Sequence, residues 1–427
     1  MNRTIGNVNT SPSLAPIQNS ERIVALDIIR ALALFGVLWV NFPVFTGANS
    51  LGSLGHPVGH GWLDAWVSGL GEVLVHGKAV SSFSMLFGIG LFIQFERAQT
   101  RGMMPASFAF RRLGGLFLIG FLHWVLIWNG DILTGYAIVG FFLLLFLNVR
   151  PKTFILAALL TFAFADSVPF LIKALHLPTA LDAFHAGADH AGAFDAVFGH
   201  GSWMACVKLR FSQWPSLDSV GYFLSCLPFV MPMFLVGALL WKQGLPQAPS
   251  SHAKLLKRLF HGTIWLGLLC SFLALDPLKL FPKVWKEAMQ GSLWSYLTDT
   301  GAYLLAIGYV IGLLRLLTKS DWAKRFGFLA PMGRMALTNY LSQSLVFTWV
   351  FYHHGLGLWG KVRPSLAVVI VVAFYALQIA WSNWWLLRFK FGPAEWLWRS
   401  MTYGKWQPFR IRPRAEDTLP MSVLELP

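Results

Sequence analysis

Two ionisable residues flank a turn in the apolar segment FLHWVLIWNGDILTGY, residues 121–136. His123 comes before Asn129-Gly130, a strong turn signal, and Asp131 follows it directly. A histidine that takes a proton from a reacting hydroxyl or amine acts as a general base, and a nearby carboxylate orients and stabilises its charged form. An ionisable group inside an apolar span is a functional candidate by default. The segment therefore predicts proton-transfer chemistry on a helical hairpin.

Helix geometry predicts how these groups are arranged. His123 lies six residues before Asn129, which places it about 9 Å below the turn at 1.5 Å per residue. Tyr136 reaches a similar depth on the second helix, so we expect His123 and Tyr136 to face each other with Asp131 above them. Two ordinary alternatives stay open: Asp131 caps the second helix, or His123 is neutral and bonded to a backbone carbonyl or to the tyrosine hydroxyl.

Two arginines are candidate contacts for an anionic substrate. In LDIIRALALFG, Asp27 and Arg30 stand at i and i+3 on one helix face, where a local ion pair is the simplest interpretation. The alternative is that Arg30 faces a cavity and binds a phosphate or carboxylate. Arg334 opens the apolar segment PMGRMALTNYLSQS, residues 331–344, and is the second candidate.

The same segment predicts a polar face inside the membrane. Arg334, Thr338 and Ser342 recur at i, i+4 and i+8, and Asn339 stands beside them. Such a face would not point at lipid. We expect it to line a water-accessible chamber near the outer side, shared with His123. Lys78, among small residues in HGKAVSSFSMLFGIG, either reaches the outer interface or holds an anion.

Composition assigns the chain to the membrane. Of its 427 residues 56% are hydrophobic and 12% charged, with a mean hydropathy of +0.56, whereas soluble domains carry about 25% charged residues. The net charge of +15 does not indicate nucleic acid, because the basic residues lie between apolar runs. Three cysteines without short spacing predict neither a disulfide framework nor a zinc site.

Apolar runs of about 20 residues predict an all-α, polytopic membrane helix bundle of about ten transmembrane helices. The larger share of Lys and Arg falls on the side of the N-terminus, which predicts that both termini are cytoplasmic. We expect a disordered segment at 1–20, a single transmembrane domain at 21–410 with an outer loop at 174–218, and a tail at 411–427. The predicted spans are 24–45, 73–95, 110–128, 131–149, 152–173, 219–241, 259–276, 297–317, 331–352 and 365–388.

Motifs of soluble enzymes are missing from the sequence. It contains no GxSxG, no P-loop and no GxGxxG placed after a strand, so soluble hydrolase and nucleotide-binding functions have no support. The His and Asp residues of the outer loop match no metal-binding spacing, and no metal site is predicted.

Five stretches together resemble the YeiB-like bacterial membrane proteins, domain-of-unknown-function family 418. They are LDIIRALALFGVLWVNF, GKAVSSFSMLFGIG, GFLHWVLIWNGDILTGYAIVG, GRMALTNYLSQS and GPAEWLWRSMTYG, in that order. The resemblance covers about residues 22–410. Three positions depart from the usual pattern, with Ala31 where glycine is common and Ala79-Val80 where bulkier residues are common. The family is similar, more remotely, to transmembrane acyltransferases that use an acyl-CoA donor from the cytoplasm and a catalytic histidine near the opposite side.

The residues and the resemblance together lead to one expected function. It is a multi-pass acyltransferase of the bacterial inner membrane, with no permanently bound cofactor and acyl-CoA as co-substrate. His123 would be the base, oriented by Asp131, and Tyr136 or Asn339 would stabilise the oxyanion. Arg30 and Arg334 would contact the donor phosphates. The alternative is a transporter or exporter of a small, anionic metabolite, with the same groups serving as substrate or proton-relay sites.

Overall fold

The computed structural model describes residues 23–49, 61–102, 104–174, 192–213, 217–275 and 293–411. Within these ranges the chain is helical apart from turns and an isolated bridge between Phe389 and Arg410. The segments predicted as a disordered N-terminus and most of the C-terminal tail lie outside the described residues, as does part of the outer loop.

The first half of the chain forms the His123 hairpin, which is made of α5 and α6, and the helices before and after it. They are α1 (Val24–Phe45), α3 (Trp62–Leu74), α4 (Lys78–Thr100), α5 (Pro105–Leu126), α6 (Leu133–Phe142) with the 3-10 turn η2 (Leu143–Phe146), and α7 (Pro151–Ala174). The predicted outer loop at 174–218 contains a π-helical turn, η3 (Asp195–Gly199), and a short helix, α10 (Trp203–Gln213).

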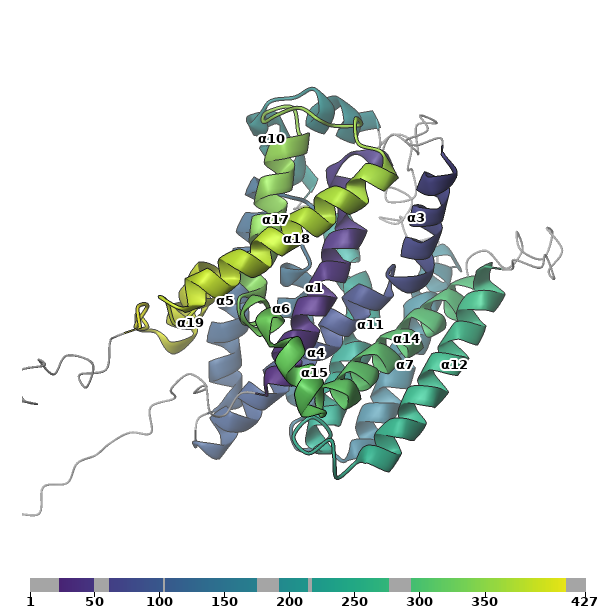
Figure 1. Cartoon of the computed structure of the whole chain (residues 1–427), viewed down its shortest axis with the longest axis vertical. Coiled ribbons are helices and arrows are strands. Elements are labelled where there is room, and N and C mark those ends of the chain that lie inside the picture. The colour runs from purple at the N-terminus through teal and green to yellow at the C-terminus, as the bar shows by residue number, and fades with distance from the viewer. Residues whose placement is uncertain are drawn as a thin grey trace, which may run out of the picture.

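The second half adds the remaining helices. They are α11 (Leu217–Lys242), α12 (Ala253–Leu275), α14 (Leu293–Leu317), α15 (Ser320–Arg325), η4 (Gly327–Leu329), α16 (Ala330–Arg334), α17 (Ala336–Phe351), α18 (Pro364–Leu386) and α19 (Pro393–Tyr403). Helices α12 and α14 lie side by side, α10 lies at one end of the bundle, and α15 lies at the other (Figure 1).

The structure supports an integral membrane protein with several spans. Among the described residues, five helical segments are long and apolar enough to cross a bilayer: Val24–Phe45, Trp62–Thr100, Pro105–Leu126, Tyr296–Leu317 and Pro364–Leu386. Shorter apolar helices cover Leu133–Phe146, Pro151–Phe164 and Phe229–Lys242. Each of the ten predicted spans overlaps a helix, but only part of that number meets the length and composition of a span.

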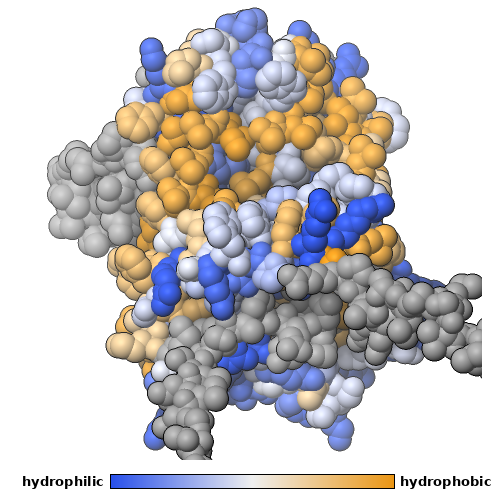
Figure 2. Space-filling model, turned by 90° about the vertical axis from the view of Figure 1, so that its left-hand side faces the viewer, coloured by the Kyte–Doolittle hydropathy of each residue, from blue (hydrophilic) through white to orange (hydrophobic). Residues whose placement is uncertain are grey.

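Apolar side chains on the outside of the bundle agree with a lipid environment. Leu159 and Val369 are 61% and 62% exposed, as are many other large apolar residues. Figure 2 shows hydrophobic residues gathered across one face, with hydrophilic residues toward both ends. An apolar surface of this extent is unusual for a soluble monomer and normal against lipid.

The helices depart from the predicted spans at two places. The predicted span 73–95 is interrupted between Leu74, where α3 ends, and Lys78, where α4 begins, and Gly77 in this turn has a φ of 73°. The predicted span 331–352 is broken at Met335, which separates α16 from α17. Arg334 therefore does not share a continuous helix with Thr338 and Ser342, and the predicted single polar face is wrong. Gly333 explains the close fit at this break, since a Cβ there would overlap the backbone carbonyl of Asp27 on α1.

Candidate functional site

His123 and Asp131 form a buried pair at the turn between α5 and α6. Nδ1 of His123 lies 2.9 Å from Oδ1 of Asp131, and the two residues are 2% and 0% exposed. A neutral imidazole that donates its Nδ1–H to this carboxylate has its lone pair on Nε2. Nε2 is buried and has no hydrogen-bond partner among the described residues. The predicted link between these two residues is present as a direct hydrogen bond.

Asp131 also fulfils the ordinary role that its position suggests. Its Oδ2 accepts hydrogen bonds from the backbone N–H of Thr134 at 2.8 Å and from the Thr134 hydroxyl at 2.6 Å. The carboxylate therefore satisfies an orphan N–H in the first turn of α6 and also fixes the imidazole. Capping and orientation of the histidine are complementary roles of one side chain here.

Tyr340 of α17 is the aromatic residue that packs most closely on His123. The two ring centroids are 5.3 Å apart, and Trp128 lies on another side of the imidazole at 6.3 Å. The Tyr340 hydroxyl donates to the carbonyl of Gly130 at 3.3 Å and accepts from the N–H of Ile132 at 3.4 Å. Tyr340 thus joins α17 to the turn that holds the His123–Asp131 pair.

Tyr136 does not face His123, contrary to the prediction. Its hydroxyl lies 2.6 Å from the Ser84 hydroxyl and 3.5 Å from the carbonyl of Val80, both on α4. The turn displaces α6 so that Asp131, rather than Tyr136, reaches the imidazole. Tyr136 lies instead on the wall of a cavity.

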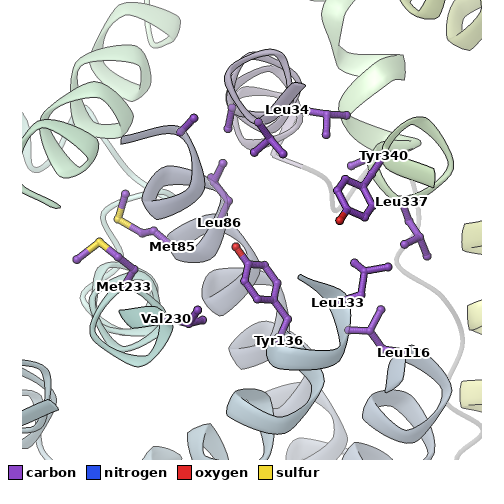
Figure 3. Packing of buried hydrophobic residues seen from close by; sticks show 14 of the residues in the cluster. Leu34, Met85, Leu86, Leu116, Leu133, Tyr136, Val230, Met233, Leu337 and Tyr340 are labelled. Carbon is purple, nitrogen blue, oxygen red and sulfur yellow. The ribbon is translucent and has the colours of Figure 1, made fainter. Parts of the chain in front are cut away.

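This cavity, of about 390 Å³, lies among α1, α4, α5, α6, α16, α17 and α19. Its apolar wall includes Leu86, Leu116, Leu133 and Leu337, with Tyr136 and Tyr340 on either side (Figure 3). His123 does not line it. Tyr340 connects the two, because it lines the cavity and its ring packs on the His123 imidazole.

Most of the charge on this cavity is positive, and it comes from five helices. Both predicted arginines line it, and Arg30 is at the same time bound to Asp27 at 2.6 Å, as the simplest interpretation required. The complete set of charged lining residues is Asp27, Arg30, Glu96, Arg97, Arg112, Arg334, Glu395 and Arg399. We expected a chamber near the outer side, but the cavity lies toward the end of the bundle where these arginines gather.

Glu395 of α19 is the buried carboxylate of this group. Its Oε1 accepts the backbone N–H groups of Leu337 at 2.7 Å and Thr338 at 3.1 Å, and Oε2 accepts the Thr338 hydroxyl. These are first-turn donors of α17, so Glu395 acts as a cap supplied from a distant helix. Burial raises the pKa of Glu395, while these hydrogen bonds act in the opposite direction.

Comparison with known proteins decides the family. A family model described as "Protein of unknown function (DUF418)" matches residues 240–405. The chain is 34% identical over 412 residues to the "Uncharacterized protein YxaH" of Bacillus subtilis (strain 168), covering 93% of this chain and 98% of the relative. The chain belongs to the DUF418 family. This DUF418 protein is also 28% identical over 392 residues to the "Uncharacterized protein YeiB" of Escherichia coli (strain K12), covering 90% of this chain and 96% of that relative.

Asn339 of the DUF418 protein lies in a polar network of its own. Its Nδ2 donates to the Ser382 hydroxyl at 2.9 Å and to the carbonyl of Met332 at 3.3 Å, and Nε2 of Gln378 donates to its backbone carbonyl at 2.9 Å. Both amide hydrogens are therefore used in binding α17 to α16 and α18. Asn339 is 1% exposed and does not line the cavity, so its predicted role as an oxyanion donor is withdrawn.

Lys78 is separate from the arginine cavity. Its ammonium donates to the carbonyl of Glu72 at 3.1 Å, and its side chain lines a second cavity of about 430 Å³ between α1, α4, α12 and α14. Lys78, the first residue of α4, therefore lines a different cavity from Arg30 and Arg334. Among the described residues, no cluster of His, Cys, Asp and Glu has the arrangement of a metal site.

Three residues of the DUF418 cavity escaped the sequence interpretation. Arg112 belongs to an Arg-Arg pair at the start of the predicted span 110–128, which is the usual basic end of a span, yet α5 begins at Pro105 and buries it. Glu395 stands in GPAEW. A single acidic residue in an apolar, tryptophan-rich segment could have marked it as a candidate site residue. Tyr340 gave no signal, because tyrosine is common in spans.

Proposed function

We propose that this DUF418 protein is an acyltransferase of the bacterial inner membrane. It would move an acyl group from a cytoplasmic donor such as acyl-CoA to a hydroxyl or amine acceptor nearer the periplasmic side. The observation that carries the proposal is the buried His123–Asp131 hydrogen bond of 2.9 Å with Nε2 left without a partner. A carboxylate-oriented imidazole with an available second nitrogen is the arrangement of a general base.

The arginine-lined cavity supports a donor that enters from the cytoplasm. The basic end of the bundle faces the cytoplasm in this proposal, since positively charged segments are retained there. Arg30 and Arg334 line the cavity at that end, where they would contact the phosphates of the donor. No permanently bound cofactor is required, and acyl-CoA serves as a co-substrate.

The transfer step uses His123 for proton movement. The acceptor oxygen or nitrogen attacks the acyl carbonyl carbon while its proton passes to Nε2, and Asp131 stabilises the imidazolium that forms. The carbon–sulfur bond then breaks, and the departing thiolate takes the proton from Nε2. The Tyr136 hydroxyl, on the cavity wall, would donate to the oxyanion that develops on the carbonyl oxygen.

Tyr340 occupies the position through which donor and base would meet. Its ring packs on His123, and its side chain lines the cavity. The proposal therefore requires the Tyr340 side chain to move when the donor binds, so that the acyl carbon comes within reach of Nε2.

The proposal is tested with inverted inner-membrane vesicles that contain the overexpressed protein. A series of radiolabelled acyl-CoAs of increasing chain length is added outside, which is the cytoplasmic face. We expect label to appear in a new hydroxyl or amine acylation product, and not in vesicles without the protein. Accumulation of unchanged label inside the vesicles would contradict the acyltransferase proposal and would indicate a transporter.

A further inference from the structure

The arginine-lined cavity has a surplus of positive charge. Five arginines and three carboxylates line it, so the lining carries a net charge of +2 when all eight are ionised. Asp27 binds Arg30, and Glu395 accepts hydrogen bonds from the N-terminus of α17.

Arg112 is the residue in which this surplus is most evident. It is 6% exposed, its Nε is buried without a hydrogen-bond partner, and no carboxylate lies within ion-pair distance of it in the part of the chain that the structure describes. Its guanidinium lies over the Trp398 ring, 3.8 Å from the centroid, and the Trp398 indole donates to the Arg112 carbonyl at 2.7 Å. A buried cation without a counter-ion is destabilising, because it loses its hydration without gaining an opposite charge. An anionic ligand supplies that charge.

The rest of the wall indicates what is attached to the anion. Beyond the arginines the cavity is lined by Leu86, Leu116 and Leu133 (Figure 3), together with Phe87 and Leu91. An apolar wall beside a basic end fits a molecule with an anionic group and an apolar body, and does not fit a small hydrophilic anion.

We propose that this cavity binds an amphiphile that carries a phosphate monoester, with the phosphate on Arg112, Arg334 and Arg399. Guanidinium groups match phosphate oxygens in paired hydrogen bonds. A phosphate monoester carries about −1.5 to −2 charges at pH 7, which equals the surplus of the lining. The inference rests on the cavity that the proposed function assigns to the donor and names the ligand class of that cavity. Its binding test stands apart from the proposed reaction, because it requires no chemistry at His123.

Two sources supply this chemistry, and the binding experiment distinguishes them. Octanoyl-coenzyme A, whose 3′-phosphate is a monoester, represents a soluble source, with octanoyl-3′-dephospho-coenzyme A as its matched control. Dioctanoyl phosphatidic acid represents a bilayer source, with dioctanoyl phosphatidylglycerol, a diester, as its control. Binding to the purified full-length protein is measured by calorimetry. We expect at least one monoester to bind at least tenfold more tightly than its control.

Variants then assign the binding to Arg112. Arg112→Gln should weaken the bound monoester at least tenfold, Arg112→Lys should weaken it less, and Arg325→Gln, an exposed arginine of α15 outside the cavity, should change nothing. The ligand should also raise the Tm of the wild type but not of Arg112→Gln, which separates ligand binding from a loss of folding. If neither monoester binds, or if Arg112→Gln binds as tightly as the wild type, the inference is overturned.

Discussion

Asp131 reaches back across the Asn129-Gly130 turn and accepts a hydrogen bond from His123 at 2.9 Å, with both side chains buried. The pair lies in the interior of the helix bundle, beside a large cluster of buried apolar residues. Capping of α6 requires only the Asp131 carboxylate. The proposed chemistry depends on the buried imidazole, whose Nε2 has no hydrogen-bond partner among the described residues.

Asp131→Asn should lower the rate of acyl transfer by about 10²–10⁴-fold, because the amide neither stabilises the imidazolium nor enforces the tautomer with Nε2 free. The rate is measured as thiol released from acyl-CoA by the purified protein. Thr134→Val removes the hydroxyl that binds the other carboxylate oxygen at 2.6 Å, and it should lower the rate far less. Equal losses in the two variants would assign Asp131 to helix capping alone.

Glu395→Ala should destabilise the protein by about 1–3 kcal/mol, because two N–H groups of α17 and the Thr338 hydroxyl lose a buried charged acceptor. Thermal unfolding in detergent measures the change. The matched control is Glu72→Ala, since the ion pair of Glu72 with His76 is exposed and should leave Tm unaltered. Similar Tm values for Glu395→Ala and the wild type would show that α17 does not depend on this cap.

Gly333→Ala should cost about 1–3 kcal/mol, because the added methyl would overlap the backbone carbonyl of Asp27 and force α16 away from α1. Gly114→Ala is the control: no atom lies within 4 Å of a Cβ there, and alanine favours the helix by up to about 1 kcal/mol. In thermal unfolding, Gly333→Ala should therefore lower the Tm, and Gly114→Ala should leave it unchanged or raise it. Equal Tm values would mean that α1 and α16 are not in close contact.

We expect the protein to lose stability in acid because of His354. Burial lowers its pKa below 6.5, and the positive charges of Arg210 and His353 act in the same direction. The unfolded chain therefore binds a proton at a higher pH than the folded one, so the stability contributed by neutral His354 is lost as the pH falls below about 6.5. His354→Asn should show a smaller drop in Tm between pH 7.5 and 5 than the wild type. An unchanged drop would contradict the assignment.

The sequence interpretation succeeded where the partners are close in the chain. His123 and Asp131 are separated by one Asn-Gly turn, and Asp27 and Arg30 by less than one helical turn, so periodicity and turn chemistry were sufficient. The membrane class could also be predicted from composition, because each long apolar run by itself indicates a lipid environment.

Contacts between distant helices were beyond that reasoning. Tyr340 reaches the His123 turn from 210 residues away, and Glu395 caps α17 from 58 residues away. The break at Met335 was hidden because an apolar run continues through it, and it places Arg334 on α16, outside the helix that carries Thr338 and Ser342. Arg112 was hidden because a basic pair beside an apolar run also marks the end of a span.

The central claim is that Nε2 of His123 removes the proton from the acceptor. The most direct test is thiol release from a saturating acyl-CoA by His123→Gln and by the wild type, with donor binding measured in the same samples. The account predicts that turnover falls at least 10²-fold while the Kd for the donor stays within a factor of two, since His123 does not line the cavity. Turnover equal to that of the wild type would contradict it.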